Sequence, residues 1–173
     1  MPTLVQSFTE LPLVSRLRRN HGLEHATLHV LSAQHPQVPM AGHSSPGGFV
    51  LVGELSTENV QEAVAEAVRR LKAGEHRLAV HPNCGTNYVA AGTLAGLAGV
   101  SAMLGVGKRL RDKLERLPLV ASMATVALIL AQPLALRLQE HVTTSGELGD
   151  LEVVEIVRVQ QGPFTAHRII TRG

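Results

Sequence analysis

The sequence predicts an α+β fold: a small β-α-β sheet domain completed by a C-terminal β-hairpin, with an inserted two-helix transmembrane hairpin and an N-terminal histidine-bearing helix. Three observations support this prediction. Two long stretches carry no charged residue, strand-like segments lie on both sides of them, and a helical pattern rich in histidine precedes them. We therefore expect three parts, at residues 1–87, 88–138 and 139–173.

The first predicted element is a helix over residues 11–32, where leucines recur at helical spacing and a group of arginines lies near the start. It ends before a stretch over residues 34–48 that contains three prolines and the pair Gly47-Gly48. Proline and glycine at this density indicate a loop. Its segment 42–48 could alternatively form a mobile lid or an anion-binding nest.

A β-α-β unit follows this loop. The apolar run 49–53 predicts a strand, Ser56 is placed to cap a second amphipathic helix, and Gly74 ends that helix. The segment 77–80 then predicts another strand. The spacing of about thirty residues is typical of two parallel strands joined by a helix.

The two charge-free stretches, residues 88–107 and 117–136, are each long enough to cross a hydrocarbon core of about 30 Å. Gly92 and Gly96 form a small-xxx-small pattern in the first stretch, which predicts close approach of the second helix. Because glycine and alanine are only weakly apolar, a buried hairpin in a soluble protein is the alternative.

The last predicted elements are strands at residues 151–159 and 164–171, on either side of Gly162-Pro163. Their alternation of apolar and polar residues predicts a hairpin that extends the first sheet.

Composition argues against nucleic-acid binding. The chain has 173 residues, a net charge of +2, three Phe, one Tyr and no Trp, so it lacks both the basic stripe and the stacking aromatics of a nucleic-acid-binding protein. Its one cysteine, Cys84, cannot form an internal disulfide. No signal-peptide pattern is seen at the start. We expect a cell-membrane protein with two spans and the lipid bilayer as its first partner. Two signals for its orientation conflict, because the basic loop over residues 108–116 favours a cytoplasmic hairpin tip, whereas the lack of a signal peptide favours a cytoplasmic soluble domain. Since basic residues also lie close to the start of the first span, we expect the soluble domain to be cytoplasmic.

The sharpest motif is His21-Gly22-Leu23-Glu24-His25 in the first helix. Residues i and i+4 of a helix share a face, so the imidazoles of His21 and His25 can converge on one zinc ion, and Glu24 could act on a metal-bound water as general base. The alternative is a polar helix face whose side chains only pack and form hydrogen bonds. His29 extends the same face by one turn.

A second motif, at residues 79–87, contains His81 and Cys84 between a predicted strand and the first apolar stretch. A cysteine just before a helix N-terminus tends towards the thiolate that a metal requires. Cys84 or His81 is therefore the natural third ligand for His21 and His25. The alternative is a tight turn in which Cys84 is a small buried filler.

Two resemblances can be stated on these residues. The spacing His21-x-x-Glu24-His25 resembles that of the inverzincin metallopeptidases, which implies two zinc-binding histidines and a catalytic glutamate. The downstream glutamate ligand of those enzymes is not identifiable here, which leaves the third ligand open. The blocks at residues 19–27, 45–49 and 79–87 resemble those of an uncharacterised family of bacterial membrane proteins known only as a domain of unknown function. That resemblance implies a membrane protein and no activity.

Three functions compete at this point. A non-catalytic membrane accessory or metal-binding module ranks first, with a membrane-protein partner or a second copy of the chain beside the bilayer. A zinc-dependent membrane hydrolase, peptidase-like and with Glu24 as base, ranks second. A thiol enzyme that uses Cys84 and His81 ranks third, and it requires an exposed, reactive cysteine.

Overall fold

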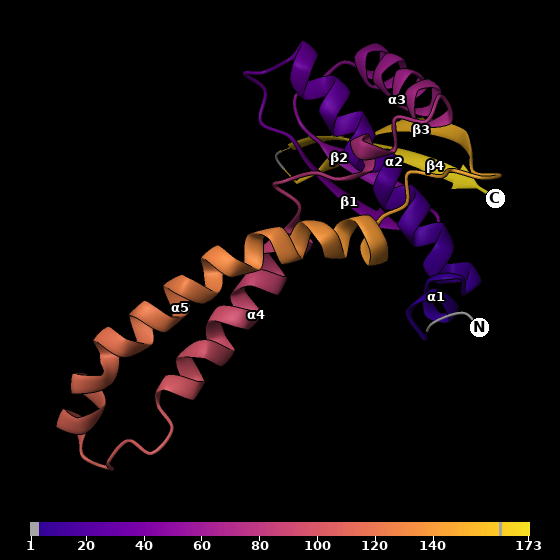
Figure 1. The fold of residues 1–173 in the computed structure, drawn as a ribbon. Helices are drawn as coiled ribbons and strands as arrows, with labels where there is room; N and C mark the ends of the chain where they lie inside the picture. The colour runs from indigo at the N-terminus through magenta and orange to yellow at the C-terminus, as the bar shows by residue number, and fades with distance from the viewer. Residues whose placement is uncertain (1–3, 163) are drawn as a thin grey trace. The chain divides into compact units, whose positions relative to one another are not determined.

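The computed structural model describes residues 4–162 and 164–173, which divide into two compact units (Figure 1). Unit 1 comprises Met1–His81 and Glu140–Gly173, and unit 2 comprises Pro82–Gln139. Unit 2 is therefore an insertion within the chain of unit 1.

Unit 1 is a mixture of helices with a four-stranded sheet in the order β1-β2-β4-β3. All neighbouring strands are antiparallel. The strands are β1 (Ala41–Ser45), β2 (Gly48–Val52), β3 (Glu152–Gln161) and β4 (Phe164–Arg172), and the helices are α1 (Leu4–Thr9), α2 (Pro12–Gln34), α3 (Thr57–Lys72), the 3₁₀ turn η1 (His76–Ala79) and the π-helical turn η2 (Gln139–Thr143).

The prediction of a parallel β-α-β unit is wrong. The segment predicted as its second strand forms η1 instead, with 3₁₀-type bonds from Leu78 N to the Glu75 carbonyl and from Val80 N to the Arg77 carbonyl. The carbonyls of Ala79 and Val80 are also occupied, because they bind the rings of His25 and His29. Histidine side chains thus take the hydrogen-bonding positions that a partner strand would need.

The predicted loop over residues 34–48 contains a strand, β1, that the sequence analysis missed. Ala41–Ser45 has none of the alternating large apolar residues that indicate a strand, yet it pairs with β2 through a short turn. Gly48 permits that turn, because its φ of 136° is rarely adopted by other residues and a Cβ there would lie 2.0 Å from the Ile169 carbonyl oxygen.

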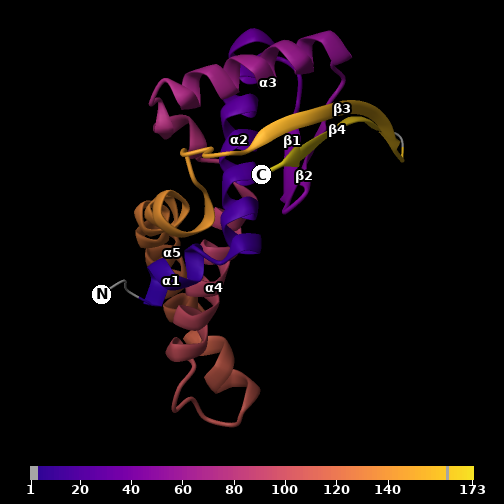
Figure 2. The same cartoon turned by 90° about the vertical axis from the view of Figure 1, so that its right-hand side faces the viewer.

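The core of unit 1 lies between the helices α2 and α3 and the sheet, as two views show (Figures 1 and 2). Phe49 and Leu51 point to the same face of β2 and are buried, and Phe49 lies opposite Ile169 of β4. The α3 helix buries one apolar stripe, and its predicted cap is present, with the Ser56 hydroxyl accepting a bond from Asn59 N at 3.2 Å.

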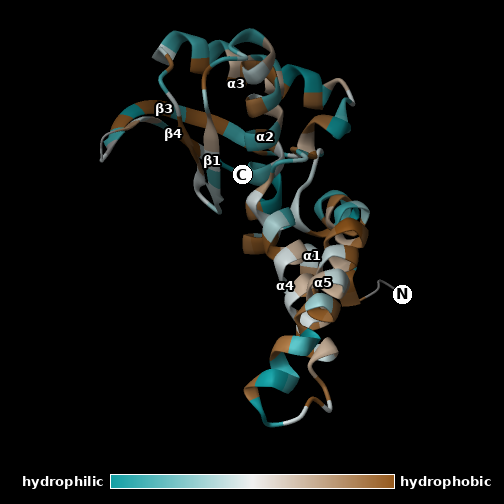
Figure 3. Ribbon diagram, turned by 90° about the vertical axis from the view of Figure 1, so that its left-hand side faces the viewer, coloured by the Kyte–Doolittle hydropathy of each residue, from teal (hydrophilic) through white to brown (hydrophobic). Residues whose placement is uncertain are grey.

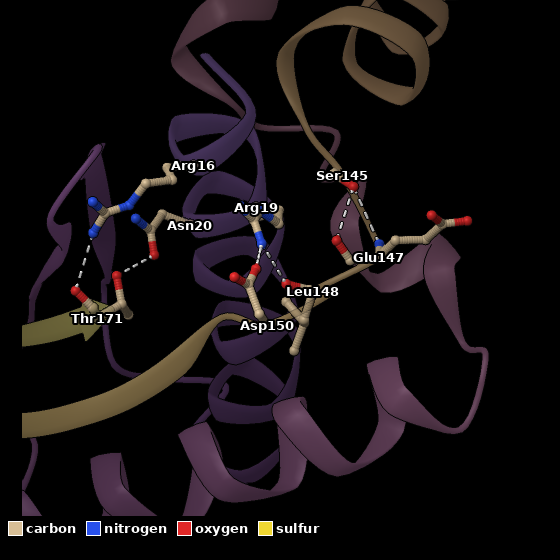
Figure 4. Close-up of polar contacts among 8 residues, drawn as sticks. All are labelled: Arg16, Arg19, Asn20, Ser145, Glu147, Leu148, Asp150 and Thr171. Atoms are coloured by element: carbon tan, nitrogen blue, oxygen red, sulfur yellow. Dashed lines mark hydrogen bonds and ion pairs between the residues drawn. The ribbon is translucent and has the colours of Figure 1, made fainter. Parts of the chain in front are cut away.

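The C-terminal hairpin is confirmed, as is its addition to the sheet that contains β2. The start of α2 binds the C-terminal part of the chain through polar contacts (Figure 4). Arg19 forms an ion pair with Asp150 and also donates to the Leu148 carbonyl at 3.1 Å, and the Thr171 hydroxyl donates to Asn20 at 2.7 Å. Residues far apart in sequence therefore hold α2 against β4.

Unit 2 consists of α4 (Gly85–Ala102) and α5 (Leu110–Leu138), which pack against each other. In the described part of the chain, one helical stretch, Leu110–Thr143, is long and apolar enough to cross a membrane. Figure 3 shows pale to brown colours, intermediate to strongly apolar, along the middle of the two helices, and teal segments near their connection. The predicted pair of spans is thus found only in part: α4 ends at Ala102, short of Gly107, and glycine and alanine make it weakly apolar.

The predicted contact through Gly92 and Gly96 is wrong. A Cβ added at either glycine would meet nothing within 4 Å, so both positions face open space. Gly99 makes the approach instead, since a Cβ there would lie 3.4 Å from Cγ1 of Val120. The small-xxx-small pattern alone does not determine which face of α4 meets α5.

Candidate metal centre

The site is built on the middle of α2, which is buried on nearly all sides. From Asn20 to Leu31, only His21 and His29 are partly accessible. Gly22 allows this burial, because a Cβ there would lie 2.0 Å from the carbonyl oxygen of Ser145 as the C-terminal segment passes. The same segment is joined to α2 by a bond from Ser145 N to the Arg18 carbonyl at 2.9 Å.

His21 and His25 lie edge to face along one side of α2, with ring centroids 4.3 Å apart. Each ring is oriented by a backbone carbonyl: Nδ1 of His21 lies 2.9 Å from the Thr143 oxygen, and Nδ1 of His25 lies 2.8 Å from the Ala79 oxygen. A carbonyl oxygen only accepts hydrogen bonds, so Nδ1 carries the proton in both rings. In the neutral form, Nε2 of each ring then has the lone pair that binds a metal.

His81 and His29 extend this pair into a row of four imidazoles. The His81 ring lies 5.7 Å from that of His25 and 4.7 Å from that of His29. Nε2 of His29 lies 2.9 Å from the Val80 oxygen, so it carries the proton and leaves the lone pair on Nδ1. The sequence places His21, His25 and His29 together by helical spacing, whereas η1 brings His81 to them.

Burial keeps His81 neutral at physiological pH. Desolvation, and then the charges that His29 and His25 carry when protonated, lower the pKa of His81 from 6.5 to about 4. A neutral imidazole is the form that binds a metal.

Glu24 is only 4% exposed and lies against β1. The Ser44 hydroxyl donates a hydrogen bond to its Oε2. Gly42 makes room for the carboxylate, because a Cβ at that position would lie 2.2 Å from Oε1. Sequence reasoning did not find Ser44 and Gly42 as partners of Glu24; the signal is their spacing of two residues, which places both on one face of a strand.

Asn20, the residue before the motif, is fully buried and joins three segments. Its amide nitrogen donates to the carbonyls of Ser45 and Pro46 at 3.0 and 3.2 Å, and its oxygen accepts from Thr171. This residue therefore fixes the turn between β1 and β2 to α2 and to β4.

Cys84 belongs to unit 2, where it is the N-cap residue of α4 and is 7% exposed. Its sulfur lies 2.8 Å from the Thr86 hydroxyl. The Asn87 amide donates to the Pro82 carbonyl at 3.0 Å. Only Pro82 and Asn83 separate Cys84 from His81, so the two Cα atoms cannot be more than about 11 Å apart.

Comparison with known proteins gives one family and no activity. The family model described as "Domain of unknown function (DUF6391)" matches residues 16–156, which include every predicted site residue. An uncharacterized protein of Picosynechococcus sp. (strain ATCC 27264 / PCC 7002 / PR-6) is 35% identical over 139 residues, covering 75% of this chain and 66% of that protein's length. No solved structure matches the chain. The match over most of its length shows that the chain belongs to the DUF6391 family.

Proposed function

We propose that this protein is a small integral membrane protein that binds zinc and acts as a membrane accessory or metal-binding module. One observation carries the metal assignment. His21 and His25 both direct Nδ1–H to a backbone carbonyl, which leaves two Nε2 lone pairs on adjacent rings of one helix. Carbonyl bonds of this kind commonly fix the tautomer and the orientation of zinc-binding histidines.

Cys84 or His81 is the proposed third ligand. His81 is supported by its ring contact with His25, and Cys84 by its place three residues further along the chain. Imidazole and thiolate together form a ligand set typical of zinc. As an accessory module, the protein would hold or sense this ion for a membrane-protein partner or a second copy of the chain.

The membrane assignment is supported by α5 and by the path of the chain. The apolar stretch at α5 is long enough to span a bilayer. Because the chain leaves unit 1 at His81 and returns to it at Glu140, it must cross the membrane an even number of times for unit 1 to fold on one side. The 18 residues of α4 extend about 27 Å, close to the hydrocarbon thickness of about 30 Å, so α4 is the proposed second span. We place unit 1 on the cytoplasmic side.

Zinc content of the purified full chain tests the metal assignment. The wild type is expected to retain about one zinc per chain through gel filtration in detergent, and His21→Ala with His25→Ala to lose it. His43→Ala is the matched control, since His43 is an exposed histidine of β1. Zinc-free wild-type protein that also fails to bind added zinc would refute the assignment.

Carbonate extraction tests the membrane assignment separately. We expect the protein to stay in the membrane pellet at alkaline pH and to be released only by detergent. Release by carbonate alone would instead support the soluble hairpin.

The second function, a zinc-dependent membrane hydrolase with Glu24 as general base, is favoured by a buried carboxylate one residue before His25. A hydrolase needs an exchangeable position on the metal, whereas a structural or sensing site is closed. Azide should change the visible spectrum of the cobalt-substituted protein only in the first case. Glu24→Gln should then keep the metal and lose hydrolysis of a generic peptide substrate. A loss of metal would make Glu24 a ligand or a necessary partner of one.

The third function, a thiol enzyme, receives less support, because Cys84 is buried and not exposed.

A further inference from the structure

Unit 1 has a second feature outside the histidine row: an exposed apolar segment at its N-terminal end. We define the N-terminal apolar segment by Leu4, Val5, Phe8, Leu11, Leu13 and Leu17. Leu4 is 91% exposed and Leu13 is 67% exposed, and none of the six belongs to the buried core. Exposed large apolar residues are normal singly, but six within fourteen residues point to a binding surface.

Helical spacing places these side chains on defined faces. Leu4 and Phe8 are four residues apart on α1, and Leu13 and Leu17 are four residues apart on α2. The connection between the helices is itself ordered, with bonds from Leu11 N to the Phe8 carbonyl and from Ser15 N to the Leu11 carbonyl. The segment is thus two short apolar faces joined by a tight connection.

Positively charged residues lie at the C-terminal end of the N-terminal apolar segment. Arg16, Arg18 and Arg19 come at the end of the segment, against one acid, Glu10, between Leu4 and Arg19. Arg19 is paired with Asp150, but the bonds described for Arg18 go to the carbonyls of His141 and Thr144 at 3.1 and 3.0 Å. These acceptors are neutral, and among the described residues no ion pair involves Arg18.

We propose that the N-terminal apolar segment inserts into the interfacial region of a lipid bilayer with anionic headgroups. Short apolar faces flanked by arginine are the features of segments that lie in the interface without crossing it. The charge favours a lipid surface over a second copy of the chain, which would bring the same arginines together. This proposal rests on the proposed membrane location of the chain, and it adds a third point of lipid contact, in unit 1 itself.

The absence of tryptophan from the sequence permits a direct test. Phe8→Trp introduces a single indole at a position that is 54% exposed. The full-length variant would be reconstituted into vesicles of phosphatidylcholine and phosphatidylglycerol, with and without brominated acyl chains. We expect a blue-shifted emission, at least twofold quenching by the brominated lipid, and protection from aqueous iodide.

Phe164→Trp is the matched control, since Phe164 on β4 is an aromatic residue of similar exposure, 59%. It should be quenched by iodide and not by brominated lipid. Quenching of both variants by lipid would overturn the proposal, because unit 1 would then contact the bilayer without a special role for the segment. Iodide quenching of Phe8→Trp, with no effect of brominated lipid, would overturn it as well.

Flotation of the same vesicles separates the two proposals. Protein that floats after a carbonate wash but shows no lipid quenching at position 8 retains the membrane-spanning helix and refutes only the interfacial segment. Protein that does not float refutes both.

Discussion

The two parts of α2 depart from the usual relation between polarity and burial in different ways. Its first turns, from Pro12 to Arg19, expose Leu13 and Leu17 to solvent, whereas its middle buries Asn20, Glu24 and His25. An ordinary amphipathic helix does the reverse, with apolar residues inside and polar residues outside. Burying polar groups is unfavourable unless they are paired. Leaving leucine exposed forgoes the favourable free energy of removing its apolar surface from water.

This difference indicates which part of the helix the fold alone explains. In the middle, each of the four buried polar side chains has a described partner: Asn20 binds Ser45 and Thr171, Glu24 binds Ser44, His25 binds Ala79, and Thr27 donates to the Leu23 carbonyl. In the first turns, by contrast, Leu13 is 67% exposed and Leu17 is 36% exposed. The middle of α2 is thus a polar site whose partners are in place, and its start belongs to the surface that we propose contacts lipid.

The largest effect is expected at His25, and it tests whether the middle of α2 is a metal site. His25→Ala removes a proposed ligand and leaves the Ala79 carbonyl unpaired, so zinc affinity should fall by about 100-fold or more and the free energy of unfolding by about 1–3 kcal/mol. Competition with a chromogenic chelator measures the first and urea unfolding the second. His43→Ala should change neither; equal affinities in wild type and His25→Ala would remove His25 from the site.

The next effect is expected at Asn20. Asn20→Ala removes the hydrogen bonds that a fully buried side chain makes to Ser45, Pro46 and Thr171, and should lower the free energy of unfolding by about 2–4 kcal/mol. A double-mutant cycle with Thr171→Val isolates the bond between the two side chains. Strict additivity in that cycle would show that this bond does not contribute.

The position of the Glu24 carboxylate can be tested by a substitution at Gly42. Gly42→Ala forces a methyl group against the Glu24 carboxylate and should cost about 1–3 kcal/mol of unfolding free energy. Gly47→Ala, in the neighbouring turn, adds a methyl group that meets nothing and should be nearly neutral. Equal stability of the two variants would mean that Glu24 is not held where β1 places it.

A smaller effect, dependent on pH, is expected from His167, a buried polar residue of β4 outside the histidine row. Burial lowers the pKa of His167, and Arg158 adds to this shift. The unfolded chain therefore binds a proton more readily, so stability should decline as pH falls from about 6.5 towards the folded-state pKa. In urea unfolding between pH 7 and pH 5, His167→Gln should reduce this decline; an identical slope would assign it to other groups.

The smallest effect is expected in the first turns of α2. Leu13→Ser should change the free energy of unfolding by less than about 0.5 kcal/mol, because this leucine is not part of the core. A loss above about 1 kcal/mol would show that the N-terminal apolar segment packs within the protein, and the contrast between the two parts of α2 would then disappear.

The sequence predicted the elements whose signals are local. Apolar periodicity predicted α2, α3 and the C-terminal hairpin, and the position of Ser56 before α3 predicted its cap. The spacing of His21 and His25 predicted that their rings would meet. It failed where distant segments decide the structure. β1 lacks a strand pattern and is defined by its pairing with β2. At η1, the rings of His25 and His29 bond to the carbonyls of Ala79 and Val80, which a partner strand would otherwise need.

The same division holds for the candidate site. The helical motif identifies three of its residues, but the partners of Glu24 come from β1, which no local pattern indicates. In unit 2, glycine spacing suggested a contact at Gly92 and Gly96, although helix rotation places Gly99 against Val120. Periodicity tells which residues share a face and leaves open which face a neighbour covers.

The order of the strands has a consequence for how the protein is made. Phe49 of β2 pairs with Ile169 of β4, and all of unit 2 is translated between them. A ribosome therefore releases the histidine motif and β2 long before it makes the strand that pairs with β2 in the sheet. Unit 1 can close only after the sequence of the helical insertion has left the ribosome, so an arrest or truncation before β4 leaves an open strand edge and an incomplete core.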